Sequence, residues 1–164
     1  MKLFYASISV FFLATIGVIM FLVNRYGVNL YDIYSEKLRM PLFTGFLTLG
    51  GFLLTLKTFV LIKLKEGLYD HEKYQELHAE RKELNSEITY YGPLSRLGNF
   101  LIFSVLLALL TSFYQFTFGF IKCNIVAAIG LALAVTTAVL VLISWWNIRN
   151  NLNSWFKLLE REKK

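Results

Sequence analysis

Four long apolar stretches alternate with shorter polar ones along this chain. They cover approximately residues 3–23, 42–62, 97–121 and 125–146. An α-helix rises about 1.5 Å per residue, so about 20 apolar residues cross the roughly 30 Å of hydrocarbon in a bilayer. Each stretch is long enough for one crossing. The pattern therefore predicts an all-α integral membrane bundle of four transmembrane helices, with residues 1–164 forming a single membrane domain.

The composition supports this class. Hydrophobic residues make up 56% of the 164 positions, whereas soluble domains usually contain about 45–50%. The single cysteine, Cys123, excludes an intramolecular disulfide framework. It lies at the start of the fourth stretch, where a packed thiol and an intersubunit disulfide are both open.

Lys and Arg are distributed unevenly between the two sides that four spans define. One side carries twelve of them: Lys2, Lys63, Lys65, Lys73, Arg81, Lys82, Arg96, Arg149, Lys157, Arg161, Lys163 and Lys164. The other carries four: Arg25, Lys37, Arg39 and Lys122. Cytoplasmic loops are enriched in Lys and Arg, so both termini and the segment between the second and third spans are expected in the cytoplasm. The net charge of +6 follows mainly from this bias and does not indicate nucleic-acid binding.

Small residues spaced by four occur in the last two spans. The third has Ser104, Ala108 and Ser112, and the fourth has Gly130, Ala134 and Ala138. Helices in lipid associate by close van der Waals approach, which small side chains permit. These residues are the predicted helix-packing faces. Packing within one four-helix bundle and packing between copies in a homo-oligomer are both open.

Ionisable side chains inside the spans would mark a path for ions or protons. Lys57 is the one ionisable candidate there, and it lies five residues before the end of the second span. Its ammonium group is within reach of the headgroups by snorkelling, although a pore lining is the alternative. Gln115 and Thr117 lie near the outer end of the third span, where we expect water to be close.

The outer loop and the C-terminal tail are both amphipathic. The loop places Tyr26, Tyr31 and Tyr34 at the expected interface depth. A short turn on the headgroups and a sensor of something outside the cytoplasm are both compatible with it. The tail, residues 147–164, is basic and has Ile148, Leu152, Trp155, Phe156 and Leu159 on one helical stripe. It is predicted to be an interfacial helix or a packing arm.

Between the second and third spans lies the charged segment, residues 63–96. It holds 13 of the chain's 28 formal charges. No Gly or Pro interrupts residues 68–91, so the sequence predicts a cytoplasmic helical stalk that extends the second span. Gly92 and Pro93 then end it and begin the third span.

Acidic side chains recur along this predicted stalk. At 100° per residue they fall within an arc of roughly 80°, and apolar side chains run beside them. The acidic set is Glu72, Glu76, Glu80, Glu83 and Glu87, and the apolar set is Leu77, Leu84 and Ile88, with Tyr91 beside them and Tyr74 at the margin. Like charges at these spacings cost about 1–2 kcal/mol in total, so a basic surface is expected to cover the ridge. That surface is the protein's own tail or a cytosolic partner protein, and a solvated face is the alternative.

Catalytic chemistry is not indicated. His71 and His78 are two turns apart, about 10 Å along a helix, too far to share one metal ion without further ligands. We interpret them as helix-surface side chains. The sequence has no Ser/His/Asp or Cys/His set, no phosphate-binding glycine loop and no CxxC motif. We therefore expect no enzyme, metal site or cofactor.

The layout resembles a known class of membrane proteins. The matching features are the glycine-containing second span "TGFLTLGGFLLTLKTFVLIKLKE", the third span's entry "YYGPLSRLGNFLIFS" and the short polar tail. With them the chain resembles small four-span proteins of bacterial phage-defence and exclusion systems, such as KwaA of the Kiwa system and RexB-like proteins. The resemblance implies a homo-oligomer in the bacterial inner membrane with one of two outputs. One is a subunit that anchors or signals to a cytosolic partner; the other is an ion-conducting pore that depolarises the membrane.

Overall fold

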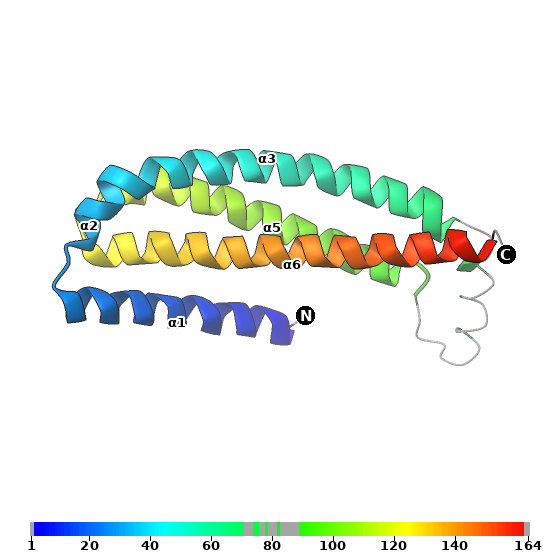
Figure 1. Ribbon diagram of the computed structural model, residues 1–164, viewed down its shortest axis with the longest axis horizontal. Helices are drawn as coiled ribbons and strands as arrows, with labels where there is room; N and C mark the ends of the chain where they lie inside the picture. Colours follow the sequence, from blue (N-terminus) through cyan, green and yellow to red (C-terminus); the bar gives the residue numbers. More distant parts are fainter. Residues whose placement is uncertain (1, 71–73, 76–77, 79–81, 83–88, 163–164) are drawn as a thin grey trace. The chain divides into compact units, whose positions relative to one another are not determined.

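The computed structural model is helical throughout its regular elements (Figure 1). It describes residues 2–162 except 71–73, 76–77, 79–81 and 83–88. Among these residues, four helices contain apolar stretches long enough to cross a membrane. They are α1 (Lys2–Tyr26), α3 (Arg39–Leu64), α5 (Gly92–Phe116) and α6 (Asn124–Glu162). Each covers one of the predicted stretches, and together they suggest a multi-pass membrane protein.

Short elements join the long helices. Helix α2 (Leu30–Ile33) and the π-helical turn η1 (Tyr34–Leu38) lead directly into α3, and a second π-helical turn, η2 (Lys65–Tyr69), follows α3. The outer loop expected before the second span is thus largely helical. At the other end of α5, the 3₁₀ turn η3 (Phe118–Phe120) precedes α6, so the third helix ends a few residues earlier than predicted.

The connection from α1 to α2 depends on Gly27. Its φ is +61°, in the left-handed region, directly after the last residue of α1. A side chain with a Cβ atom is strained in that conformation, whereas glycine adopts it freely and commonly ends helices in this way.

The chain forms two compact units. The first contains Met1–Gly51 and Ser104–Val141, and the second contains Phe52–Phe103 and Leu142–Lys164. Helices α3, α5 and α6 each contribute residues to both.

Small and polar side chains fill the interior of the first unit. Ser104, Ala108 and Ser112 are fully buried in α5, and Gly130 and Ala134 are buried in α6. Phe46 packs with Ala108 and Ala134 in one hydrophobic cluster. Hydrogen bonds also join the helices. For example, Ser112 donates to the Phe43 carbonyl at 2.8 Å, and the Thr111 and Thr137 hydroxyls lie 2.7 Å apart.

Ala138 does not share this interior, because its side chain is exposed. A spacing of four residues advances 400° around a helix, so each step moves the face by about 40°. Ala138 is therefore about 80° from Gly130. The buried side of α6 continues instead through Thr137, seven residues after Gly130. The structure of one chain leaves packing between copies as a prediction.

Tyr34 lies inside the first unit, and its expected depth at the membrane interface stays a prediction. Its side chain is fully buried, and its hydroxyl hydrogen-bonds the Gln115 side-chain oxygen. Gln115 is also fully buried, not near water as expected, and it donates to the Gly130 carbonyl at 3.0 Å. Tyr31 is also hydrogen-bonded within this unit: its hydroxyl donates to the Phe120 carbonyl at 3.2 Å. Tyr26 remains 72% exposed.

Two glycines allow Tyr34 to reach this position. A Cβ atom on Gly130 would lie 2.9 Å from the Tyr34 hydroxyl, and one on Gly119 would lie 2.8 Å from it. Both separations are shorter than van der Waals contact. The tyrosine therefore depends on the absence of side chains at these two positions.

The second unit has a larger apolar core. Its buried members are Val60, Leu64, Tyr69, Leu97, Leu101 and Ile148. Leu152 packs against the same cluster, so α6 continues without a break at residue 147 into the predicted tail. For Ile148 and Leu152, this placement matches a packing arm better than an interfacial helix. The side chains of residues 154–162 lie outside the described ones.

Gly130→Ala is expected to destabilise the protein by about 1–3 kcal/mol, because the added methyl group collides with Tyr34 and with Gln115, 3.2 Å away. Unfolding by denaturant in mild detergent measures the loss. Gly45→Ala is the matched control, since a Cβ atom there meets nothing within 4 Å. Equal stability of the two variants would contradict the close packing described for Gly130.

Candidate functional site

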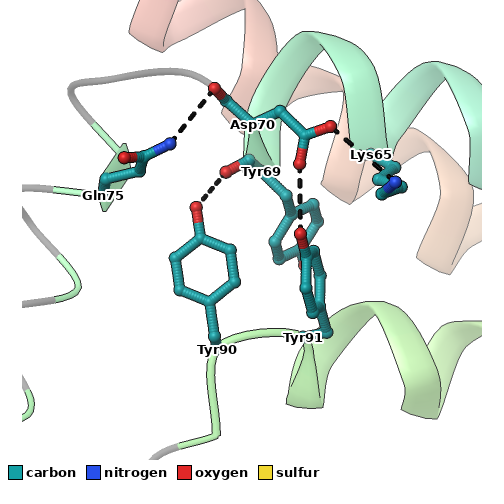
Figure 2. Close-up of polar contacts among 6 residues, drawn as sticks. All are labelled: Lys65, Tyr69, Asp70, Gln75, Tyr90 and Tyr91. Atoms are coloured by element: carbon teal, nitrogen blue, oxygen red, sulfur yellow. Dashed lines mark hydrogen bonds and ion pairs between the residues drawn. The ribbon is translucent and has the colours of Figure 1, made fainter.

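The described ends of the charged segment meet through two tyrosine hydrogen bonds (Figure 2). The Tyr90 hydroxyl donates to the Tyr69 carbonyl, and the Tyr91 hydroxyl donates to the Asp70 carboxylate at 3.1 Å. Tyr69 and Asp70 follow the second span, whereas Tyr90 and Tyr91 immediately precede the third. The chain therefore leaves and returns at one place.

Asp70 occupies the centre of this arrangement. Its backbone is in a turn, with φ −82° and ψ 2°, and its amide donates to the Lys65 carbonyl at 2.9 Å. Besides accepting from Tyr91, its carboxylate lies 4.0 Å from the Lys65 ammonium group. Gln75 donates to the Asp70 carbonyl at 3.4 Å, as Figure 2 also shows. These contacts stabilise the turn that ends the helix.

Aromatic rings surround the two hydrogen bonds. Tyr69, Tyr74, His78, Tyr90 and Tyr91 form what we call the tyrosine cluster. The ring centroids of Tyr74 and Tyr69 are 4.8 Å apart, those of His78 and Tyr90 are 4.8 Å apart, and those of Tyr90 and Tyr91 are also 4.8 Å apart. All three pairs have edge-to-face geometry, which is worth about 0.5–1.5 kcal/mol per pair beyond burial.

The pKa values of Tyr69, Tyr90 and Tyr91 are all raised. Loss of contact with water, then the neighbouring Tyr74, raises the pKa of Tyr69 to about 12. Desolvation, followed by the Asp70 carboxylate, raises the pKa values of Tyr90 and Tyr91. A raised pKa favours the neutral phenol in the folded state, so stability from Tyr69 persists up to about pH 10 and declines as the pH rises toward 12. Near neutral pH, all three hydroxyls remain hydrogen-bond donors.

The predicted continuous stalk is interrupted where the structure describes it. Asp70 forms a turn after Tyr69, the described residues Tyr74, Gln75, His78 and Lys82 are again helical, and residues 89–91 lie outside any helix. The Asp70 contacts with Lys65 and Tyr91 therefore interrupt the single continuous helix expected from propensity alone. Tyr91 and Tyr74, expected beside the acidic ridge, instead pack in the tyrosine cluster.

The ridge itself lies outside the described residues. This applies to all eight predicted docking positions: Glu72, Glu76, Glu80, Glu83, Glu87, Leu77, Leu84 and Ile88. Their helical geometry and their role in docking stay predictions. His71 is also outside the described residues. His78 is helical, as expected, but it is partly buried and its ring packs against Tyr90.

Lys57 occupies the buried side of α3. It follows Leu53 by four residues and precedes Val60 by three, and both of those side chains are buried. Lys57 itself is only partly exposed. Its backbone position is thus on the stripe that packs against other helices, although a long lysine side chain is able to extend away from it.

Metal-binding geometry is not present in the described part of the chain. No group of three His, Cys, Asp or Glu side chains there lies close enough to hold a metal ion. Among the described residues, Cys123 is a free, partly buried thiol. The chemistry of the described site consists of phenol, carboxylate and ammonium groups that hydrogen-bond to one another.

Sequence reasoning missed the pairing of Tyr69 and Asp70 with Tyr90 and Tyr91. The signal available was a Tyr-Asp pair after one span and a Tyr-Tyr pair before the next. Helical periodicity placed them at opposite ends of a rod, because it treats each residue only relative to its local neighbours. Comparison with protein-family models, curated proteins and solved structures finds no match for this chain.

Replacing Tyr90 and Tyr91 with Phe is expected to loosen the ends of the charged segment. Each lost hydrogen bond is worth about 0.5–1.5 kcal/mol, so amide hydrogen exchange at Lys65–Asp70 should accelerate up to about tenfold per bond. Tyr26→Phe is the control, because Tyr26 is 72% exposed. Unchanged exchange in the double variant would show that the two hydrogen bonds do not hold the ends together.

Proposed function

We propose that this protein is an oligomeric membrane subunit that presents residues 71–88 to a cytosolic protein. The observation that carries the proposal is the closure of both ends of this segment by the Tyr90 and Tyr91 hydrogen bonds. These bonds fix the two ends of the segment at one place on the helices. Conformational entropy that these ends have already lost is not lost again when a partner binds, which favours binding.

Charge defines the kind of partner. Residues 71–88 contain five glutamates and three Lys or Arg residues: Glu72, Glu76, Glu80, Glu83, Glu87, Lys73, Arg81 and Lys82. An acidic segment with interspersed Leu77, Leu84 and Ile88 fits a basic, partly apolar docking face. The protein's own tail, through Lys157, Arg161, Lys163 and Lys164, is the competing basic surface.

Two different arguments support the proposed location of the protein in the cell. The excess of Lys and Arg on one side supports a cytoplasmic position for both termini and for the charged segment. The layout resemblance to phage-defence and exclusion proteins supports the bacterial inner membrane and a role in antiviral defence. Neither argument requires a cofactor or catalytic activity.

An ion-conducting pore is the second candidate, and Lys57 is the observation that favours it. Ionisable residues on the packed face of a membrane helix commonly mark ion paths, and Lys57 lies between Leu53 and Val60 on such a face. The polar side chains of the third span favour a pore less than Lys57 does. Thr111 and Gln115 are buried and hydrogen-bonded to protein groups, so they are satisfied without water.

Reversing Glu76, Glu80 and Glu83 to Lys is expected to abolish partner binding while membrane insertion persists. Lost attraction and added repulsion amount to about 2–5 kcal/mol where the pairs are desolvated. Affinity purification in mild detergent followed by mass spectrometry measures the loss of the partner. Reversal of Lys73, Arg81 and Lys82 to Glu is the matched control, because it changes three charges in the same segment but should retain binding.

A further variant adds a reversal of the four basic tail residues to Glu: Lys157, Arg161, Lys163 and Lys164. If this restores the assembly, the tail is the surface that the acidic segment contacts. Retention of the oligomer and of every associated protein in the triple Glu→Lys variant would refute the docking proposal. In that outcome the acidic ridge is a solvated face.

The pore candidate predicts that the protein depolarises cells by itself and that Lys57→Ala changes conductance or ion selectivity. Recordings in planar bilayers and a membrane-potential dye measure these effects. Lys63→Ala is the control, since Lys63 is exposed and pairs with Glu66 at 3.4 Å. Silent bilayers with the wild-type protein would eliminate the pore.

A further inference from the structure

Four exposed basic residues surround the apolar core of the second unit. Lys63 and Lys65 flank the core residue Leu64, Arg96 precedes the core residue Leu97, and Arg149 follows the core residue Ile148. Because these core residues belong to one contact cluster, the basic residues beside them lie at similar depth along the helices. We call these four residues the basic belt.

The belt coincides with the ends of the membrane-spanning stretches. In the described chain these stretches end at Gly67, begin at Gly92 and end at Asn153. Each basic residue of the belt lies within four residues of one of these limits. Side chains near the ends of membrane-spanning helices are the ones that reach lipid headgroups.

Among the side chains that the structure describes, no carboxylate compensates the charge of the two arginines. Lys63 pairs with Glu66 at 3.4 Å, and Lys65 lies 4.0 Å from Asp70. Neither Arg96 nor Arg149 has a carboxylate within ion-pair distance among the side chains that the structure describes. The belt therefore retains a positive surface formed mainly by Arg96 and Arg149.

Two tryptophans adjoin Arg149 on α6. Trp145 is 55% exposed and Trp146 is 56% exposed. The Arg149 guanidinium carbon lies 5.5 Å from the centre of a Trp145 ring. Tryptophan prefers the membrane–water interface because its ring is apolar and its N–H is polar. Exposed tryptophan beside unpaired arginine is the composition expected of a headgroup contact.

We propose that the basic belt binds the phosphates of anionic phospholipids, with Arg96 and Arg149 as the principal contacts and Trp145 and Trp146 at the acyl boundary. Arginine donates several N–H groups in a planar arrangement that matches phosphate oxygens. A basic residue near an anionic leaflet contributes about 1 kcal/mol, about fivefold in binding. The ends of the charged segment are then held at the membrane surface, because Tyr69 belongs to the same core.

This inference rests on membrane insertion of the helices but not on a docking partner. If the acidic-segment variants lose a cytosolic protein, the lipid-binding inference is unaffected. If the protein shows no lipid selectivity, the docking proposal is unaffected. An acidic protein bound to the same belt is the competing occupant. That occupant would bind in the absence of anionic lipid.

The experiment measures quenching of tryptophan fluorescence by brominated lipids in nanodiscs. A Trp155→Phe background leaves Trp145 and Trp146 as the reporters among the three tryptophans. We expect brominated phosphatidylglycerol to be enriched around them relative to brominated phosphatidylcholine. Replacing Arg96 and Arg149 with Gln should lower the enrichment about fivefold per residue, and added salt should lower it in the unmutated protein by screening.

Arg25→Gln combined with Lys122→Gln is the matched control. It removes the same charge from the first unit and should leave the enrichment unchanged. Three results would overturn the proposal: no preference for phosphatidylglycerol in the unmutated protein, equal losses in both double variants, or enrichment that does not respond to salt. The salt series needs no belt variant, so the test remains decisive if the arginine double variant fails to fold.

Discussion

Apolar surroundings supply no hydrogen-bond partners, and this constraint explains much of the structure. Thr44, Thr48 and Thr58 lie on exposed positions of α3, and each donates to a backbone carbonyl four residues earlier. Buried polar groups of the first unit pair across helices, as Thr111 does with Thr137 and Gln115 does with Tyr34. Thr136 has a buried hydroxyl without a partner in the described residues. Small residues make the pairing possible, since Gly119 and Gly130 leave room for the Tyr34 ring.

Polar groups are also paired in the tyrosine cluster, beside the end of η2 and the start of α5. There, Tyr90 and Tyr91 bond to a carbonyl and a carboxylate from the other end of the charged segment. Each interaction is individually modest. Several of them act on the same few residues, however, together with edge-to-face ring contacts and burial of Tyr69 in the second unit's core. Local propensity for a continuing helix is weaker than this combination, so the helix is interrupted by a turn at Asp70.

The two proposals assign different functions to neighbouring surfaces. The acidic residues 71–88 are proposed to face a basic protein surface, and the basic belt is proposed to face anionic lipid. Opposite charges placed close together in this way also favour one orientation of the segment over others. A negative membrane surface repels glutamates and attracts Arg96 and Arg149, so lipid binding by the belt directs the acidic segment away from the headgroups.

Local sequence determined the number, the apolar character and the approximate limits of the four long helices, because hydrophobic length is a property of consecutive residues. It also indicated the small side chains at Ser104, Ala108, Ser112, Gly130 and Ala134 that proved to be buried. Tertiary structure decided the burial of Tyr34, the exposure of Ala138 and the meeting of Tyr69 and Asp70 with Tyr90 and Tyr91. Those outcomes depend on which side chains distant in sequence approach one another. A helical pattern gives the face on which a residue lies, but it does not state what that face meets.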